Sequence, residues 1–449
     1  MAVALSPSRP YAVPAPEYAT LPAPRALAAG DTALGKLAFG ALWIFVFVVP
    51  WEESVPLLGG FVISRWVALA ASFLLVLSVL ATRQLRRPSA IHLLMLALVA
   101  WSAITLFWTI DGTMTETRVG TYAQLLLAAW IMWELATTET RVISMLEAYL
   151  FGAAVLAIDT LINYSQGIQA ADLSAEQGIV QYHDERYTMY GINANDLALM
   201  VALSLPIAIF LMARARSPWL KLFCWIHMGV SLAALFLVGS RGGLIAAGVA
   251  LLLFPLLMFR MGKIQRVGFL LVCVTGVAVG IHFIPADDWN RLLNTGKEIS
   301  QGTLTHRTVL WDAGFDVLRS HPWGGVGAGA YATATYKETG RALVAHNTFI
   351  SVLVETGIPG FLLFLALLGS LCYAAWRFDY LNRCFWAILL ATWAIGVSAL
   401  TWEYRKPTWF LFGVLVAHAY VRRSAASRPA ETGAIGNSRG DSLSRIRGQ

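Results

Sequence analysis

Four short polar motifs hold the residues of this chain whose types could do chemistry, and each motif adjoins an apolar run. The motifs are "RYTMYGINAND" (186–196), "GSRGG" (239–243), "HRTVLWDAGFDVLRSHPWGGVG" (306–327) and "AHNTF" (345–349). They place arginine and histidine side chains at or near the predicted ends of helices. An arginine at a helix N-terminus favours a nearby anion, and a neutral histidine can accept a proton. The motifs therefore predict a site that combines anion binding with general base catalysis.

His346 is the candidate base. It stands directly before Asn347 and Thr348, either of which can cap the apolar helix that follows. The positive end of that helix's dipole disfavours an imidazolium ion and favours a neutral imidazole. The alternative is a structural histidine that only caps the helix or donates a hydrogen bond.

Arg241 begins an apolar run directly after Ser240, a residue type that commonly caps helices. A cation at the positive end of a helix dipole costs roughly 0.3–1 kcal/mol, and a nearby anion reverses that sign. We therefore expect Arg241 to bind an anion, with Ser240 supporting the helix start. The alternative is an arginine that only snorkels to lipid head groups.

Two further arginines carry weaker signals. Arg186 lies a few residues ahead of an apolar run that Asn193 can cap, but arginines in loops are usually solvated, and that is the alternative here. Arg307 opens an amphipathic stretch in which Trp311 and Phe315 follow at helical spacing. This stretch predicts a surface helix at the membrane interface, for which simple membrane docking is the alternative.

Glu355 is the ionisable residue that stands inside an apolar run. Pro359 has no N–H to donate to the Glu355 carbonyl, so the sequence predicts a kinked helix with one freed carbonyl. Thr348, Ser351 and Glu355 share a helix face. We expect Glu355 to tie helices together, and a supporting role in the site is the alternative.

Several other patterns are rejected as sites. The glycine-rich stretch 324–329 follows no predicted strand and precedes no Lys-Ser or Lys-Thr pair, so we expect a flexible turn there and not a nucleotide loop. The adjacent Glu52 and Glu53 do not by themselves make a metal site. The four cysteines have no metal-ligand spacing: Cys224, Cys273, Cys372 and Cys384. We expect no metal and no cofactor.

The composition is that of an integral membrane protein. Hydrophobic residues make up 57% of the chain and charged residues 13%, and the mean hydropathy is +0.63. A soluble globular domain would carry roughly 25% charged residues. The net charge of +7 requires no nucleic-acid partner, because cytoplasmic loops of membrane proteins are expected to be basic.

About twelve apolar segments are long enough to span, or nearly span, a membrane. They lie near 36–50, 61–82, 90–109, 119–136, 142–163, 193–213, 219–239, 241–259, 266–284, 347–376, 383–401 and 406–421. The first segment lacks a small-residue cleavage signal, so we expect a retained span. The sequence thus predicts an all-α polytopic protein.

The predicted spans divide the chain into five parts. Spans 1–9 fill residues 35–284 and spans 10–12 fill residues 347–421, with a large loop containing short helices at 285–346. Residues 1–34 are rich in Pro and Ala, and residues 422–449 are rich in Ser, Arg and Gly. Both ends are expected to be disordered tails.

The charges of the loops predict the orientation of the bundle. Basic loops fall on the side shared with the N-terminus: "RQLRRP" (83–88), "RARSPWLK" (214–221), "RMGKIQR" (260–266) and "RR" (422–423). By the positive-inside rule both termini are cytoplasmic. The long loops near 164–192 and 285–346 then lie outside, and the four polar motifs share the outer face.

Three stretches give the chain a resemblance to a known family. They are "SRGG" at the start of a span, "HRTVLWDAGFDVLRSHPWGGVGAGAY" in the large loop, and "HNTFISVLVETGIPG". Together with the layout of spans, they resemble the O-antigen ligase and polymerase superfamily of bacterial envelope glycosyltransferases. The resemblance covers residues 186–375 by motif, and the layout is most like the lipopolysaccharide O-antigen ligase.

This resemblance implies a reaction and a location. A ligase moves a glycan from an undecaprenyl diphosphate donor to a sugar hydroxyl of the lipid A core, with inversion and without an essential metal. The enzyme would lie in the bacterial inner membrane among membrane lipids, with a periplasmic active site. His346 matches the family's His before Asn, and Arg241 matches its Arg after Ser.

The remaining site residues follow from the same resemblance. Arg186 and Arg307 match family arginines less closely, and with Arg241 they are expected to bind the donor diphosphate. The supporting residues are expected to be Ser240, Asn347, Glu355 and Trp311.

Three other classes of protein remain open. An O-antigen polymerase has the same donor and motifs but uses a second lipid-linked glycan as acceptor. A protein O-oligosaccharyltransferase more often carries a large soluble C-terminal domain, whereas only about 28 residues follow the last predicted span here. A twelve-span transporter would show an internal repeat with polar breaks at the bilayer midplane, and the sequence has no such repeat.

Overall fold

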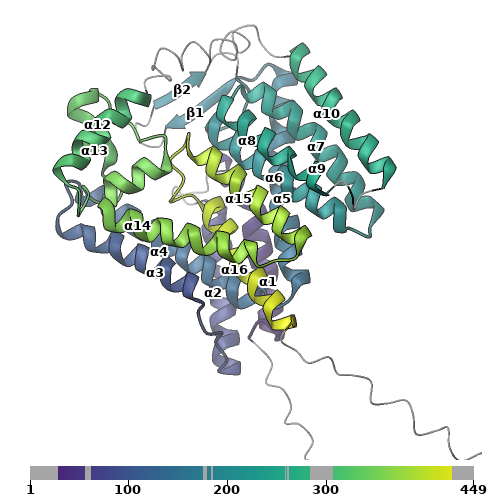
Figure 1. Cartoon of the computed structure of the whole chain (residues 1–449), viewed down its shortest axis with the longest axis horizontal. Coiled ribbons are helices and arrows are strands. Elements are labelled where there is room, and N and C mark those ends of the chain that lie inside the picture. Colours follow the sequence, from purple (N-terminus) through teal and green to yellow (C-terminus); the bar gives the residue numbers. More distant parts are fainter. Residues whose placement is uncertain are drawn as a thin grey trace, which may run out of the picture.

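Long helices dominate the architecture. The computed structural model describes residues 29–55, 62–174, 179–183, 186–257, 259, 262–283 and 307–426. Figure 1 shows the long helices packed as a bundle, with two short helices and a β-hairpin beside them. Residues 1–28 and 427–449 of the expected tails lie outside the described residues, as do residues 285–306 of the expected loop.

A helix lies at each of the twelve predicted positions. Their bounds are α1 Ala33–Val48, α2 Ile63–Thr82, α3 Ala90–Ile104, α4 Gly112–Leu135, α5 Glu139–Gln166, α6 Ala194–Arg214, α7 Pro218–Val238, α8 Arg241–Leu251 continued by α9 Leu253–Leu257, α10 Lys263–Phe283, α14 Thr348–Trp376, α15 Tyr380–Val397 and α16 Lys406–Ala426. The short helices are η1 Ala29–Asp31, η2 Glu52–Ser54, η4 Thr105–Phe107, α12 Arg307–Ser320 and α13 Tyr331–Thr339.

The predicted fold class is confirmed. Within the described residues, 7 helices are long and apolar enough to cross a membrane: α2, α3 with η4, α5, α6, α7, α14 and α15. The chain is therefore a multi-pass α-helical membrane protein. One small sheet is added to the prediction, because β1 (Ala170–Ser174) and β2 (Ile179–His183) pair as an antiparallel hairpin.

Helix α6 forms the centre of the bundle. In its most apolar 18-residue window 94% of the residues are buried, against 22% in α2. Helices α5, α7, α8 and α15 surround α6. A helix that is apolar all round must be covered on every side by neighbours, whereas a peripheral helix can expose apolar residues to lipid.

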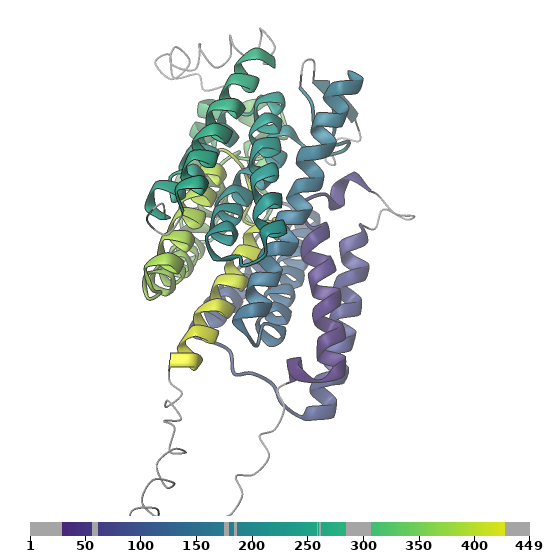
Figure 2. The ribbon, with the colours of Figure 1, turned by 90° about the vertical axis from the view of Figure 1, so that its right-hand side faces the viewer.

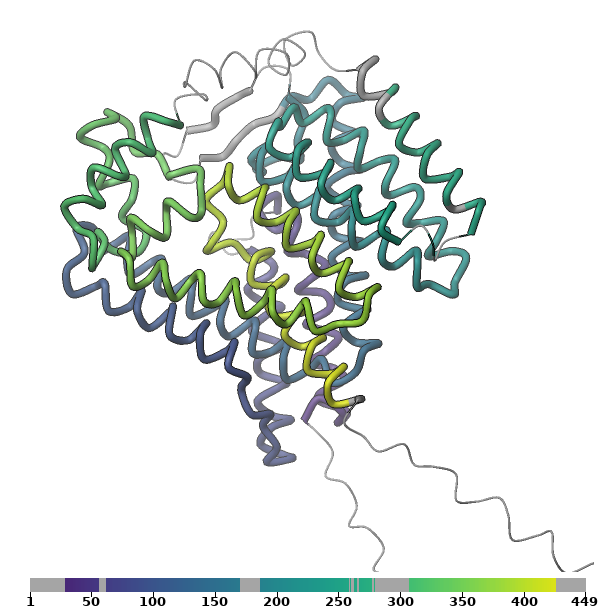
Figure 3. Tube along the Cα trace, viewed as in Figure 1, coloured from purple at the N-terminus to yellow at the C-terminus, as the bar shows by residue number. Residues whose placement is uncertain are grey.

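The peripheral helices pack in pairs. Figure 2 shows α1 and α2, both purple, side by side at one edge of the bundle. Figure 3 shows α14 running beside α3. Helix α14 also contacts α12, α15 and α16, so it joins the short helices to the bundle.

Candidate functional site

The N-terminus of α8 is capped as its sequence predicts. Ser240 caps α8 by accepting from the Gly243 N–H at 3.3 Å, and its hydroxyl donates to Asn195 Oδ1 at 2.8 Å. Asn193 in turn caps α6 by accepting from the Asn195 N–H. Arg241 is the first residue of α8, so its cation lies at the positive end of that helix.

Two glycines let the start of α8 approach its neighbours closely. A Cβ at Gly243 would lie 2.3 Å from the Ala198 Cβ of α6, which is too close for any larger residue. A Cβ at Gly242 would lie 3.3 Å from the Ala399 Cβ. Residues 398–405 join α15 to α16, and we call them the α15–α16 linker. The start of α8 is thus held between α6 and this linker.

The same linker holds the N-terminus of α14. Asn347 caps α14, accepting from the N–H groups of Phe349 at 2.9 Å and Ile350 at 3.1 Å. Its Nδ2 donates to the Ser398 carbonyl at 3.1 Å. The prediction of a capped helix directly after His346 is therefore met by Asn347.

Thr348 and Trp402 complete this attachment. The Thr348 hydroxyl donates to the Leu400 carbonyl at 2.9 Å and accepts from the Trp402 N–H at 2.8 Å. The Trp402 indole donates to Asp196 Oδ1, in the first turn of α6, at 2.7 Å. The α15–α16 linker consequently joins the N-terminal ends of α6, α8 and α14. We call the end of the bundle where they meet the site end.

His346 has an unusual backbone and a perturbed imidazole. Its φ is 46°, and within the described residues only Arg83 shares a positive φ among residues other than glycine. Such backbone strain is often found at functional sites. The side chain is half-buried, and burial together with the nearby Arg307 cation lowers the pKa of His346 to about 4. The imidazole is therefore neutral near pH 7.

Helix α12 brings Arg307 to His346. The Trp311 indole donates to the Ala345 carbonyl at 2.9 Å, which fixes α12 to the residue before His346. Arg307 lies four residues before Trp311 and therefore on the same face of α12. Burial and the nearby Arg241 cation lower the pKa of Arg307. His346, Arg307 and Arg241 thus form one basic cluster.

Arg186 belongs to a neighbouring part of the site end. The Tyr187 N–H donates to the Leu237 carbonyl near the end of α7, at 3.2 Å. The Thr188 carbonyl accepts from Asn163 Nδ2 of α5 at 2.9 Å. These contacts place Arg186 by the ends of α5 and α7, close to the turn that leads to Arg241. They do not join Arg186 to His346.

The predicted kink in α14 is present. The backbone at Gly357 is not helical, with φ 67° and ψ −174°, two residues before Pro359. The Glu355 carbonyl accepts from the Gly327 N–H at 2.9 Å instead of from its own helix. The glycine-rich stretch 324–329, expected to be a flexible turn, is therefore folded against the kink.

The Glu355 side chain lies in a buried polar cluster. It accepts from the Gly329 N–H at 2.7 Å and lies 3.9 Å from Arg118 Nη1 of α4. The same Arg118 atom lies 3.1 Å from Glu403 Oε1, to which the Ser351 hydroxyl donates at 3.0 Å. Glu355 thus connects α14 to α4, the glycine-rich stretch and the α15–α16 linker.

The sequence did not single out Arg118 or Glu403. Arg118 stands in the polar start of α4 and Glu403 in a short connection, so neither interrupts an apolar run as Glu355 does. The one feature of the sequence that could have pointed to them is that each is a charged residue next to a predicted end of a span. Within the described residues, no group of three or more His, Cys, Asp or Glu side chains could hold a metal ion.

Comparison with known proteins covers the part of the chain that holds this cluster. Residues 226–365 match the family model described as O-Antigen ligase, and they include Arg241, Arg307, His346 and Glu355 but not Arg186. The exopolysaccharide production protein ExoQ of Rhizobium meliloti (strain 1021) is 32% identical over 111 residues. That match spans 22% of this chain and 25% of the relative's length. Residues 226–365 are therefore similar to the O-antigen ligase family, and this similarity supports the resemblance that the motifs predicted.

Proposed function

We propose that the protein is an inverting glycosyltransferase that moves a glycan from an undecaprenyl diphosphate donor to a sugar hydroxyl of the lipid A core. The observation that carries this proposal is the convergence of His346, Arg307 and Arg241 at the site end. A neutral base beside two half-buried cations suits an acceptor hydroxyl and an anionic leaving group. The similarity of residues 226–365 to the O-antigen ligase family supports the same substrate class.

Each residue of the cluster has a chemical role in this proposal. The acceptor oxygen attacks the anomeric carbon from the face opposite the diphosphate, and His346 takes the hydroxyl proton. The bond from the anomeric carbon to the phosphate oxygen breaks, and the diphosphate leaves with the electron pair. Arg241 and Arg307 stabilise the charge that develops on the diphosphate, with Arg186 contacting it from the α5–α7 side. One displacement inverts the anomeric configuration.

Four residues support this arrangement without touching the reacting atoms. Ser240 and Asn347 cap the helices that present Arg241 and His346. Trp311 fixes α12 and so positions Arg307. Glu355 holds the glycine-rich stretch against α14.

We place the enzyme in the bacterial inner membrane, with both termini in the cytoplasm and the site end at the periplasmic face. The basic loops and the positive-inside rule support this orientation. The reaction requires no metal or cofactor, because arginine side chains supply the cations that the diphosphate needs.

Polymerisation is the second candidate. The relative's name refers to exopolysaccharide production, which favours a polymerase that extends a lipid-linked glycan. A polymerase would use the same donor and the same cluster, and only the acceptor would differ.

Analysis of lipid-linked products in a deletion strain tests these functions. Loss of a ligase leaves long polymer on the polyisoprenyl carrier and lipid A core without glycan. Loss of a polymerase leaves core that carries a single repeat unit. A deletion that leaves lipid-linked glycans, core and exported polysaccharide unchanged would contradict both functions. Complementation with the wild-type gene and with His346→Ala shows whether the cluster is responsible.

A further inference from the structure

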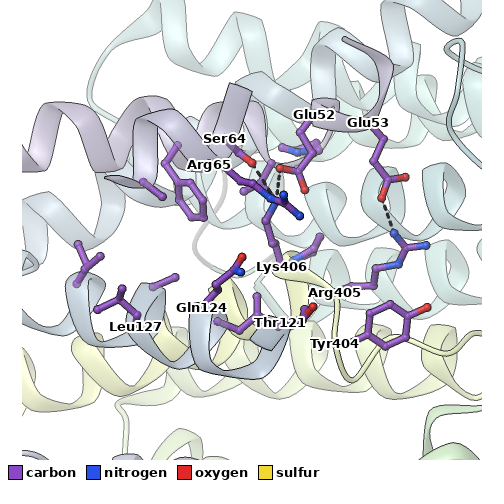
Figure 4. Close-up of a pocket in the computed structure, with 18 of the residues that line it drawn as sticks. Glu52, Glu53, Ser64, Arg65, Thr121, Gln124, Leu127, Tyr404, Arg405 and Lys406 are labelled. Carbon is purple, nitrogen blue, oxygen red and sulfur yellow. Dashed lines mark hydrogen bonds and ion pairs between the residues drawn. The ribbon is translucent and has the colours of Figure 1, made fainter. Parts of the chain in front are cut away.

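A second cavity lies away from the basic cluster. It has a volume of about 510 Å³ and is lined by α1, α2, α4, α6 and the start of α16. Figure 4 shows Gln124 and Leu127 of α4 on one side of it and Ser64 and Arg65 of α2 on the other. The volume is within the ~300–1,000 Å³ of ordinary ligand sites, so the cavity can enclose part of a long molecule.

The lining of the cavity is amphipathic. Its polar end contains two ion pairs, Glu52 with Lys406 at 2.5 Å and Glu53 with Arg405. Lys406 Nζ also donates to Ser64 Oγ at 2.9 Å. Deeper in the bundle the lining becomes apolar.

The apolar lining comes from three helices. It includes Phe45 of α1, Leu69 of α2, and Leu125, Leu127 and Ile131 of α4. Such a space can hold a hydrocarbon chain, whereas burying the hydroxyl groups of a sugar there without hydrogen-bond partners would cost free energy.

The cavity opens sideways between α2 and α4. Trp66, Leu69 and Leu127 line it, yet 56%, 60% and 50% of their surfaces are exposed. Exposed apolar residues on a membrane-spanning helix face lipid tails. A lipid chain can therefore enter from the bilayer without passing through water.

The α15–α16 linker separates this cavity from the basic cluster. Its later residues, Tyr404 and Arg405, line the cavity with Lys406 of α16. Its earlier residues hold the N-terminus of α14 directly after His346. Arg405 also donates to Asp196 Oδ2 at 2.9 Å, and the other carboxylate oxygen of Asp196 binds Trp402. The polar end of the cavity and the basic cluster thus adjoin the same short segment, the α15–α16 linker.

We propose that this cavity holds the hydrocarbon chain of the lipid-linked donor, an inference that rests on the proposed function. The polyisoprenyl chain enters between α2 and α4, and its diphosphate end emerges at the α15–α16 linker. The chain ends beside Arg405 and Lys406, and the diphosphate and its glycan extend past the linker to Arg241, Arg307 and His346. The polar end of the cavity adjoins the reacting groups, and this position favours the donor over a bulk phospholipid as the occupant.

Filling the cavity tests the proposal with purified full-length protein. Ser72 lines the cavity from α2, and Val76 lies one turn further along α2 outside the lining. Ser72→Phe should raise the KM for an undecaprenyl-linked donor about tenfold or more, the value expected when roughly two methylene groups lose their contacts. It should leave the KM for a donor with a ten-carbon chain unchanged, and Val76→Phe should change neither value.

A chain-length effect shared by Val76→Phe, or an equal loss with both donors, would overturn the proposal. The ten-carbon donor also controls for folding, because a misfolded Ser72→Phe protein would fail with both substrates.

Photo-crosslinking gives a readout that does not depend on catalysis. The probe is undecaprenyl diphosphate with a photoreactive group in its chain. It should label peptides of α2 and α4, and unlabelled undecaprenyl diphosphate should compete while the same excess of phosphatidylglycerol should not. Equal competition by phosphatidylglycerol, or labelling confined to other helices, contradicts the chain site. Correct labelling without glycosyl transfer retains the chain site and counts against the proposed function alone.

Discussion

His346 determines how the rate should depend on pH. Its pKa is lowered to about 4 by burial and by Arg307, so an essential neutral imidazole is lost only as the pH falls through about 4. Bound diphosphate would offset the arginine charges and raise the imidazole pKa. The acidic limb of kcat/KM, which reports the free enzyme, should therefore lie at lower pH than that of kcat. Coincident limbs near pH 6.5 would indicate an unperturbed histidine.

Substitution of His346 separates a base from a structural residue. Glutamine can donate and accept hydrogen bonds but cannot take up a proton near neutral pH. His346→Gln should lower kcat by about 10²–10⁴, as for a lost general base, while donor affinity stays within a small factor. Single-turnover rates and donor binding measure the two quantities. Near-normal turnover in a folded Gln variant would reject the base assignment.

Arg241 should behave as a diphosphate ligand and not merely as a cation. Arg241→Ala should reduce kcat/KM by about 10–100-fold, the range for a lost hydrogen bond to a charged group. Arg241→Lys should recover only part of this, because lysine lacks the planar fork. Arg319 of α12, whose side chain is 77% exposed, provides the matched control as Arg319→Ala. Equal activity of the Arg241→Ala and wild-type enzymes would contradict diphosphate binding and indicate that Arg241 only contacts lipid head groups.

At the scale of elements, the link between α12 and the start of α14 can be tested at Trp311. Trp311→Phe removes the donor to the Ala345 carbonyl but keeps the ring packing. A lost hydrogen bond of this kind should lower kcat about 3–10-fold. The acidic limb of kcat/KM should also move to higher pH, because Arg307 would no longer be held beside His346. Trp323→Phe, on an exposed tryptophan, is the control.

The kink of α14 makes a separate prediction about stability. Gly357 has a φ of 67°, and a Cβ there would lie 2.5 Å from the Trp323 carbonyl oxygen. Gly357→Ala should therefore destabilise the protein by about 1–3 kcal/mol or more. Gly369→Ala on the same helix, where a Cβ meets nothing within 4 Å, should have little effect. Thermal unfolding in detergent compares the two, and equal Tm values would contradict the strain.

The elements that the sequence predicted well are those with a local cause. Twelve apolar runs predict twelve helical positions because burial in lipid requires internally bonded backbone. Ser240, Asn347 and Pro359 predict two caps and a kink because their side chains act on adjacent backbone. The glycine-rich stretch was expected to be a flexible turn, and its packing against the kink was not predicted.

Other features depend on long-range contacts. The pairing of Arg118 with Glu403 joins residues that lie far apart in the chain, and no local sequence pattern indicates that they pair. The β1–β2 hairpin within the predicted outer loop also left no pattern that the sequence analysis recognised. The joint attachment of α6, α8 and α14 to the α15–α16 linker required the three-dimensional structure.

At the scale of the whole molecule, the orientation in the membrane is open to direct test. Single cysteines at the exposed positions Glu338 and Arg216 should react with an impermeant thiol reagent from opposite sides of the membrane. Glu338→Cys should be labelled in intact spheroplasts, and Arg216→Cys only after permeabilisation. The protein without added cysteines is the control. Labelling of both cysteines from one side would contradict the predicted orientation, in which α13 lies at the periplasmic face.

The contacts at the α14 kink also have a consequence for biosynthesis. Carbonyl groups left without partners inside a bilayer cost several kcal/mol each. Here the Val354, Glu355 and Thr356 carbonyls receive donors from Val326, Gly327 and Trp101. All three donors precede α14 in the chain, so the ribosome has already made them when this helix is inserted. The kinked helix α14 therefore enters the membrane after all three donors have been synthesised. Each carbonyl freed at the kink can then accept its hydrogen bond as soon as the helix is inserted.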